Sequence, residues 1–154
     1  MLDLTLVKVP DKGQVYPFVF EPSEVSANWD SICPFLEASV RVSFNMISLV
    51  QLRRLLESGE AVCIGIARDN EPLAIFVAHI VNYSDYRCAR VIAAAGTQLK
   101  DAMRYFHVME GWAMSLGATE IEAWCRPAME RMLRRYGFKH RVSIITRRIE
   151  RSYQ

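Results

Sequence analysis

The spacing of apolar residues in the first third of the chain predicts two helices. Residues 24–40, "EVSANWDSICPFLEASV", follow Ser23, a side chain suited to an N-cap. A residue before proline is pushed away from helical geometry, so we expect this helix to break or restart at Cys33–Pro34. Residues 43–60, "SFNMISLVQLRRLLESGE", form a stronger amphipathic pattern, and Gly59 stands where a C-terminal cap belongs.

The pattern then becomes that of strands. Three apolar segments, 61–69, 72–84 and 88–96, are separated by the turn sequences "DNE" and "DYR" and predict an antiparallel meander. The middle segment is apolar enough to be covered on both faces. Near the N-terminus, apolar and polar residues alternate over 4–9, which predicts a short strand. The following "DKGQVYPFVFEPS" contains turn residues around an apolar patch.

After Gly96 the apolar residues return to helical spacing as far as Gly117, which predicts one long helix. A strand (119–125), a short helix (127–136) and a last strand (138–150) follow. A late strand–helix–strand step has to cross over and run parallel. We therefore predict one α/β domain over residues 1–154, weakest in pattern over 1–30, with a mixed, mostly antiparallel sheet and helices on both faces.

Composition narrows the class of protein. Apolar residues make up 51% and charged residues 23%, which indicates a globular chain rather than a disordered one. The apolar runs are too short for a membrane span, and the N-terminus lacks the pattern of a secretory signal. Four scattered cysteines without a C-x-x-C pair favour reduced, mostly buried thiols over a zinc site or disulfides.

Charge is distributed unevenly along the chain. From Arg126 to Gln154 nine Lys and Arg residues stand against two Glu, a net charge of +7, so the preceding residues of this +2 chain carry −5. Such a basic segment can contact nucleic acid or an acidic protein, or can simply be a solvated helix face and an edge strand protected by arginines. The candidate surface comprises Arg131, Arg134, Arg135, Lys139 and Arg141.

The order of elements, with "FHVMEGWAMSLGATEIEAWC" and "MERMLRRYGF", resembles the GCN5-related N-acetyltransferase (GNAT) superfamily. It is most similar to the short acetyltransferase-like proteins encoded among bacteriophage virion genes. The resemblance covers about residues 29–149 and is strongest over 91–149. It implies an acyl-CoA cleft where the fourth and fifth strands splay apart, with the pyrophosphate held by main-chain amides of the turn after the fourth strand.

The turn that this resemblance assigns to the cofactor, residues 97–102, departs from the family's pattern. The candidate cofactor residues are Gln98, Leu99, Lys100 and Ala102. Only Ala102 matches; Thr97 replaces the leading Gln or Arg, and Lys100 replaces a glycine that lets the phosphates approach the backbone. Lys100 could partner a phosphate, but Asp101 would repel one. The segment therefore favours a plain turn.

The catalytic positions implied by the resemblance are also altered. Leu133 stands where the family often has a tyrosine, and Arg126 replaces a common asparagine. The fourth strand carries no carboxylate or histidine near its end, so Glu120 and Glu122 of the fifth strand are the nearby candidates for a general base. If the chain is active, we expect Glu122 to serve.

Other patterns give little support for further chemistry. His107 and Glu110 have helical i, i+3 spacing, but three scattered histidines do not predict a metal site. His79 lies in an apolar strand and reads as a hydrogen-bonded core residue. No G-x-S-x-G turn indicates a hydrolase.

We therefore expect a non-catalytic GNAT-fold structural or interaction protein of a bacteriophage particle or its infection machinery, without a cofactor. Its expected partners are other virion proteins, with DNA or an acidic protein at the basic surface, in the virion or the host cytoplasm. The alternative is an acetyl-CoA-dependent N-acetyltransferase of unknown acceptor. A third possibility is a regulator that binds CoA without catalysis.

Overall fold

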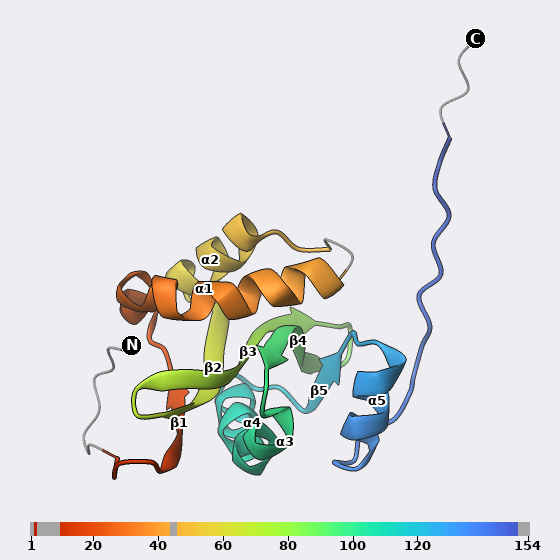
Figure 1. Ribbon diagram of the computed structural model, residues 1–154. Coiled ribbons are helices and arrows are strands. Elements are labelled where there is room, and N and C mark those ends of the chain that lie inside the picture. Colours follow the sequence, from red (N-terminus) through yellow and green to blue (C-terminus); the bar gives the residue numbers. More distant parts are fainter. Residues whose placement is uncertain (1, 3–9, 44–45, 151–154) are drawn as a thin grey trace. The chain divides into compact units, whose positions relative to one another are not determined.

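The computed structural model describes residues 2, 10–43 and 46–150 (Figure 1). The chain forms two compact units, residues 1–124 and 125–154, and each is described by itself. The first unit contains the sheet and most of the helices; the second contains one helix and an extended segment. The strand expected at residues 4–9 lies outside the described residues.

The first unit is built on a five-stranded sheet whose strands follow in chain order. They are β1 (Val15–Val19), β2 (Ala61–Arg68), β3 (Glu71–Asn82), β4 (Arg87–Gly96) and β5 (Glu120–Ala123). The first three pairings are antiparallel, whereas β4 and β5 pair in parallel. The predicted meander and parallel crossover are confirmed. The apolar patch read as a turn region is in fact β1.

Two helices, α1 (Val25–Val42) and α2 (Leu49–Ser58), cover one face of the sheet (Figure 1). The predicted break at Pro34 is wrong: α1 continues through it, and the helix starts after Glu24 rather than at Ser23. Ile32 and Leu36 on either side are fully buried in the core. Because tertiary packing outweighs the hydrogen bond that proline cannot donate, the helix survives.

The start of α2 is set by a capping box. Ser48 Oγ accepts from the Gln51 amide at 3.1 Å, and Gln51 Oε1 accepts from the Ser48 amide at 2.8 Å. This satisfies two main-chain donors at the helix start, so the helix begins after Ser48 and not at residue 43 as expected. Gly59 ends α2 in the left-handed conformation (φ 79°), as predicted.

The opposite face is covered by α3 (Leu99–Ala102) and α4 (Phe106–Ser115), joined by a 3-10 turn at Met103–Tyr105 (Figure 1). The single helix predicted here is therefore interrupted. Met103 is buried, and the Tyr105 hydroxyl donates to the Val15 carbonyl of β1 at 3.2 Å. These long-range contacts tighten one turn of the helix. Helices lie on both faces of a mixed sheet, which confirms the predicted fold class.

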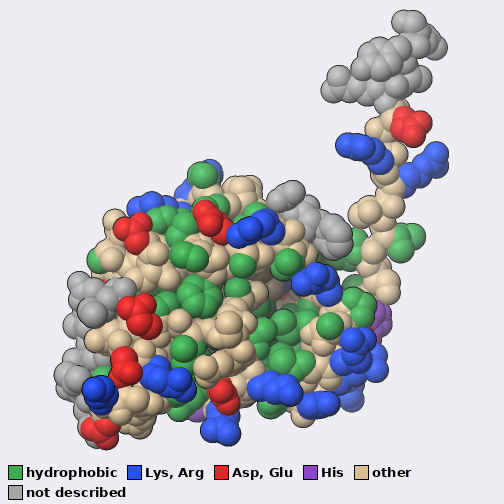
Figure 2. Space-filling model, in the orientation of Figure 1, with side chains coloured by type: hydrophobic (Ala, Val, Ile, Leu, Met, Phe, Trp, Pro, Cys, Tyr) green, Lys and Arg blue, Asp and Glu red, His purple; other side chains and the backbone are tan. Residues whose placement is uncertain are grey.

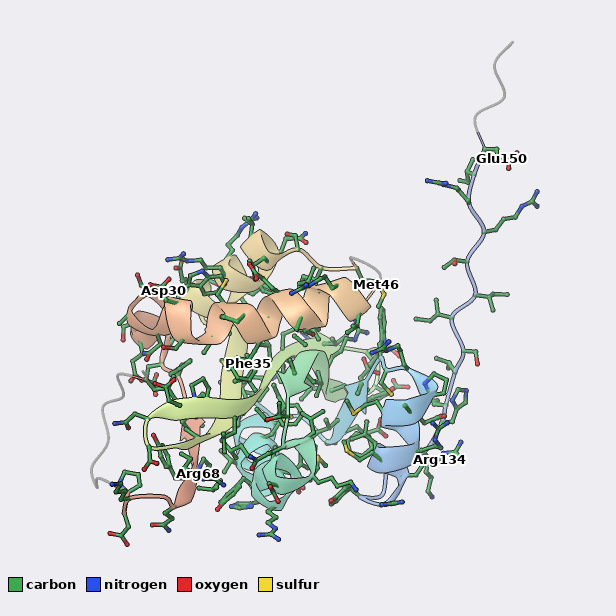
Figure 3. The ribbon with its side chains drawn as sticks, viewed as in Figure 1. Asp30, Phe35, Met46, Arg68, Arg134 and Glu150 are labelled. Carbon is green, nitrogen blue, oxygen red and sulfur yellow. The ribbon has the colours of Figure 1, made fainter. Side chains whose placement is uncertain are left out.

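The second unit contains α5 (Pro127–Arg134), two residues shorter than the expected helix. The strand predicted at 138–150 is wrong: these residues are extended but belong to no strand (Figures 1 and 3). A strand requires a neighbour for its main-chain hydrogen bonds, and this unit holds no other strand among its described residues.

Along residues 2, 10–43 and 46–150, no helix has the length and apolarity needed to cross a membrane. Over the same residues, no three His, Cys, Asp or Glu side chains gather closely enough to hold a metal ion.

Candidate functional site

The strand β5 ends before β4 does, and the length of β4 beyond that end, called the gap below, is where an acyl-CoA cleft was expected. Their parallel ladder ends at the pair Val91↔Ala123, while β4 continues to Gly96. On its other side β4 has a bulge at Ile92, because Val77 pairs with Ala93 and Ala78 with Val91. A bulge bends a strand locally and increases its twist.

The main chain of β4 within this gap is already engaged. The Ala94 amide donates to Ser39 Oγ of α1 at 3.2 Å, and Ser39 is 5% exposed. A ligand lying along a strand uses the strand's outward main-chain groups, as an added strand would. At Ala94 the buried hydroxyl of Ser39 competes for that donor.

The turn after β4 is held by strand packing. Gly96 has φ +141°, and a Cβ there would lie 2.4 Å from the Leu73 carbonyl oxygen of β3. The Thr97 amide donates to the same carbonyl at 3.3 Å. Glycine is therefore required at residue 96 for close approach of β3 and β4.

The four predicted cofactor residues lie together at the start of α3 because they are almost consecutive. Gln98 and Leu99 are partly exposed, Lys100 is exposed, and Ala102 is buried with its amide donating to the Gln98 carbonyl at 3.0 Å. A helix of four residues has a small dipole, and the Asp101 carboxylate lies in its first turn. These residues fit a pyrophosphate poorly.

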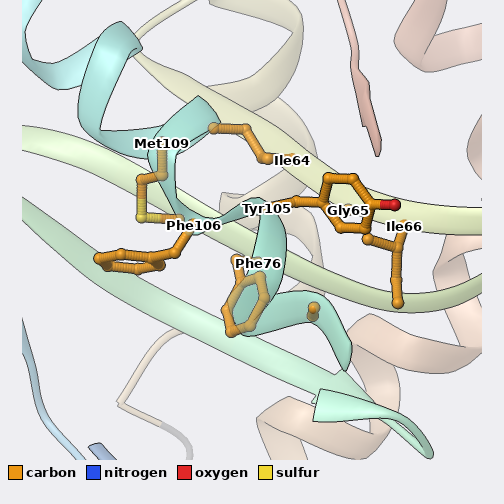
Figure 4. Close-up of a pocket in the computed structure, with 8 residues that line it drawn as sticks. Ile64, Gly65, Ile66, Phe76, Tyr105, Phe106 and Met109 are labelled. Atoms are coloured by element: carbon orange, nitrogen blue, oxygen red, sulfur yellow. The ribbon is translucent and has the colours of Figure 1, made fainter. Parts of the chain in front are cut away.

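Ala102 also lines a small apolar pocket between the sheet and the α3–α4 segment (Figure 4). Its other lining residues come from β2, β3 and the interrupted helix: Ile64, Gly65, Ile66, Phe76, Tyr105, Phe106 and Met109. Tyr105 is the single titratable residue of this lining. The pocket therefore provides apolar contact and no pair of acid–base groups.

Glu122, the candidate general base, belongs to a polar cluster at the paired end of β4 and β5. Its carboxylate accepts from Arg90 Nε at 2.7 Å and from the Tyr83 hydroxyl at 2.8 Å. Arg90 also donates to the Tyr83 oxygen at 3.1 Å and lies over the Trp124 ring, 4.3 Å from its centroid. The hydrogen bond to Glu122 raises the pKa of Tyr83. Burial lowers the pKa of Arg90, but hydrogen bonds to Glu122 and Tyr83 outweigh it and leave the pKa raised.

This cluster gives Glu122 a bracing role. Arg90 lies opposite Glu122 across the β4–β5 ladder and opposite His79 across the β3–β4 ladder. With two donors on its carboxylate, Glu122 ties β5 to β4 and has fewer lone pairs free to accept from an incoming amine. Glu120, the other candidate base, lies on the same strand with an exposed side chain.

His79 is half-buried, but its Nε2 has no hydrogen-bond partner, so the expected hydrogen-bonded core histidine is wrong for that atom. Burial and the nearby Arg90 charge lower its pKa. A lowered pKa keeps the His79 ring neutral at neutral pH, which suits a half-buried position on β3 opposite Arg90.

The five predicted basic residues all fall in the second unit. Arg131, Arg134 and Arg135 lie on or at the end of α5, and Lys139 and Arg141 follow it. All five residues are exposed. Lys and Arg side chains gather over this region in Figure 2, and Figure 3 shows Arg134 on α5.

Glu130 is one of the two acidic residues in this basic segment. Its Oε1 lies 2.7 Å from His140 Nδ1 and 3.6 Å from Arg134 Nη2. The hydrogen bond with His140 and the charge of Arg134 lower the pKa of Glu130. Glu130 thus links α5 to the segment that follows. Leu133, at the position of the family's tyrosine, is buried and offers no hydroxyl.

The cysteines do not supply a nucleophile. Burial raises the pKa of Cys63 to about 12 and that of Cys88 to about 11, so both remain protonated at neutral pH. Cys33 is half-buried and Cys125 is exposed, and burial raises the pKa of each. The expectation of mostly buried thiols holds for two of the four.

Sequence reasoning missed Ser39, Tyr83 and Arg90. Ser39 is one of several serines in a helix, and nothing in its neighbours marks it as a partner for β4. Tyr83 and Arg90 meet Glu122 through strand register, across 39 and 32 residues of sequence. Alternation along β4 would show which face Arg90 shares, but not which residue of β5 lies opposite.

Comparison with known proteins identifies the fold. No protein-family model matches the sequence, and no curated protein matches it. Several solved structures match over nearly their whole length. An aminoglycoside acetyltransferase from an uncultured soil metagenomic sample is 16% identical, covering 89% of this chain and 99% of its own, with a TM-score of 0.65.

Two further structures agree. A GCN5-related N-acetyltransferase from Ralstonia eutropha is 10% identical, covering 87% of this chain and 98% of its own, with a TM-score of 0.66. A predicted acetyltransferase from Clostridium acetobutylicum, solved with acetyl-CoA, is 8% identical, covering 88% and 96%, with a TM-score of 0.62. At these identities the likeness is one of fold: the chain has the architecture of GNAT acetyltransferases.

Proposed function

We propose, from the GNAT fold and the altered site within it, that this chain is a binding protein that does not transfer acyl groups. It acts as a structural or interaction part of a bacteriophage particle or its infection machinery. The phage setting is taken from the sequence resemblance alone. The observation that carries the non-catalytic part is the hydrogen bond from the Ala94 amide to Ser39, which engages β4 inside the gap.

Three other features support the same conclusion. Lys100 and Asp101 stand where a pyrophosphate would need open backbone, Leu133 offers no proton for a departing thiolate, and Glu122 is held by Arg90 and Tyr83. Each removes one element of acyl transfer from CoA. Together they leave the gap beside β4 without a phosphate-binding turn, a proton donor for the thiolate or a free general base.

Titration calorimetry with acetyl-CoA, and with CoA as control, tests this proposal. We expect no saturable heat at millimolar ligand with the full chain. Micromolar binding of acetyl-CoA, together with transfer of its acetyl group to an amine and release of free CoA, would show that the site transfers acyl groups and would refute the proposal. Micromolar binding without release would instead support the regulator that keeps CoA binding.

The second candidate is an acetyl-CoA-dependent N-acetyltransferase of unknown acceptor. The early end of β5 favours it, because β4 runs on from Val91 to Gly96 without β5 beside it. Here the amides near residues 98–102 would hold the pyrophosphate. Lys100→Gly should then bind acetyl-CoA more tightly than Lys100→Ala, because both remove the lysine side chain but only glycine opens the backbone.

The interaction role has its own tests. Mass spectrometry of purified particles of the phage that encodes the chain should detect it in a fixed ratio to other virion proteins. The basic surface of the second unit is the proposed contact for DNA or an acidic protein. Charge reversal at Arg134 and Arg135 should weaken that binding at least tenfold at low salt, and unchanged affinity would remove this surface from the proposal.

A further inference from the structure

Positive charge gathers on one side of α5. Arg131, Arg134 and Arg135 are exposed, and their i, i+3 and i, i+4 spacing places them on the same face of the helix. Leu133 of the same helix is buried. The helix therefore has one buried side and one basic side that faces solvent, and Lys and Arg side chains gather over this region in Figure 2.

The charge of this basic face is not balanced by the carboxylate beside it. Glu130 of the same helix has its carboxylate 2.7 Å from His140 Nδ1 and 3.6 Å from Arg134 Nη2. Among the described residues, no carboxylate forms an ion pair with Arg131 or Arg135. Like charges at this helical spacing destabilise a helix, so a bound anion would relieve a repulsion that the chain leaves in place.

The side chains of the basic face limit the kind of anion. A guanidinium is planar and can donate two parallel hydrogen bonds to the oxygens of one phosphate or one carboxylate. The arginines therefore fit the backbone of a nucleic acid and the acidic side chains of a protein equally well. A further feature has to separate these two partners.

That feature is the aromatic ring of Tyr136, which follows the arginines directly. Its side chain is 46% exposed. The Tyr136 amide donates to the Leu133 carbonyl at 2.9 Å, and the Gly137 amide donates to the Arg134 carbonyl at 3.2 Å, so the backbone that carries the ring is fixed at the end of α5. A nucleotide base can stack on such a ring, whereas aspartate and glutamate side chains have no ring to stack.

Stacking on Tyr136 also separates single strands from duplexes. In a duplex the bases are paired and stacked on one another, whereas the bases of a single strand can turn outward onto an aromatic side chain. Basic side chains for the phosphates beside an aromatic ring for the bases are typical of proteins that bind single strands without sequence preference.

We propose that the basic face of α5 and Tyr136 together bind single-stranded nucleic acid. Arg131, Arg134 and Arg135 contact the phosphates, and one base stacks on the Tyr136 ring. This inference rests on the proposed function, in which the basic surface contacts DNA or an acidic protein, and it names the partner of that surface.

Fluorescence anisotropy with a short labelled oligothymidylate tests the proposal on the full chain. We expect saturable binding at low salt. Arg131→Gln should weaken it several-fold and should reduce the slope of log affinity against log salt concentration by about 0.7, the value for one phosphate contact of a single strand. Arg54→Gln, the same charge change at an exposed arginine of α2, should leave affinity and slope unchanged.

A second pair of variants tests the aromatic ring. Tyr136→Ala should weaken binding at least fivefold, because base stacking contributes about 1–3 kcal/mol, while Tyr136→Phe keeps the ring and should keep the affinity. Since Tyr136 is exposed, both variants should fold, and circular dichroism checks this. Equal affinities for the two variants would overturn the proposal. So would tighter binding of a duplex of the same length than of the oligothymidylate.

Polyglutamate as a second probe separates this inference from the proposed function. Binding of polyglutamate that depends on Arg131, without binding of oligothymidylate, would overturn the inference and leave the basic surface as a contact for an acidic protein. Binding of neither probe at low salt would overturn the inference and also remove the basic surface from the proposed function.

Discussion

A methyl group added at Gly65 tests how closely the three strands at the start of the sheet pack. Gly65 lies in β2, opposite Phe18 of β1 and Ile75 of β3. A Cβ at this position would lie 2.4 Å from the Ala74 carbonyl oxygen and 2.6 Å from Phe18 Cζ. The first contact is with backbone, so it cannot be relieved by rotating a side chain.

The cost follows from this geometry. Overpacking a core by one methyl group destabilises proteins by about 1–3 kcal/mol, and a contact with backbone in the middle of a sheet belongs at the upper end, about 2–3 kcal/mol. For a chain of this length, each kcal/mol lowers the melting temperature by about 2–4 °C. We therefore expect Gly65→Ala to melt about 4–12 °C below the unchanged protein.

Gly111 provides the matched control. It lies in α4, is exposed, and a Cβ there would meet nothing within 4 Å. The same methyl group should stabilise the chain by about 0.5–1 kcal/mol, because alanine loses less backbone freedom than glycine in a helix. Thermal and urea unfolding followed by circular dichroism measure both variants. A Gly65→Ala protein as stable as the unchanged one would refute the packing argument.

Three further predictions concern α1, the polar cluster and the thiols. Pro34→Ala should stabilise the chain by about 1–3 kcal/mol in urea unfolding, because the exposed position regains a helical hydrogen bond; a loss of stability would mean that α1 needs its proline. The pKa of Tyr83 is raised in the folded protein, so its contribution to stability is present below the unfolded pKa of about 10 and is lost as pH rises through the folded value. Glu122→Gln should lower the pH at which Tyr83 ionises, measured by absorbance at high pH with Tyr83→Phe as the reference. An unchanged titration would contradict the assigned hydrogen bond. In the native protein a thiol reagent at neutral pH should modify exposed Cys125 well before Cys63, whose pKa is about 12, so equal rates would contradict the burial of Cys63.

Much of the fold could be predicted from local patterns. The strands β2, β3 and β4 were expected within two residues of their observed ends, because apolar runs between turn sequences are short-range signals. Gly59 was expected as the cap of α2, since the left-handed conformation strongly favours glycine. The parallel β4–β5 pairing agrees with the predicted strand–helix–strand crossover.

The failures of prediction come from long-range contacts. Pro34 was expected to break α1, but the burial of Ile32 and Leu36 keeps the helix continuous. The long helix predicted after Gly96 is interrupted where the Tyr105 hydroxyl bonds to β1. The strand expected at 138–150 is wrong because a local sequence pattern does not specify which neighbouring strand will pair with it.

The features of the candidate site also fall into those that are visible in the sequence and those that depend on long-range contacts. The residue types of the turn 97–102, the lysine at position 100 and the carboxylate of Glu122 can be read from the sequence, since they depend only on which residue stands at which position. Only the tertiary structure decided that Ser39 engages the Ala94 amide and that Arg90 and Tyr83 hold Glu122. The physical reason is register: hydrogen bonds between strands and helices join residues far apart in the chain, and their pairing is fixed by the packing of the whole sheet.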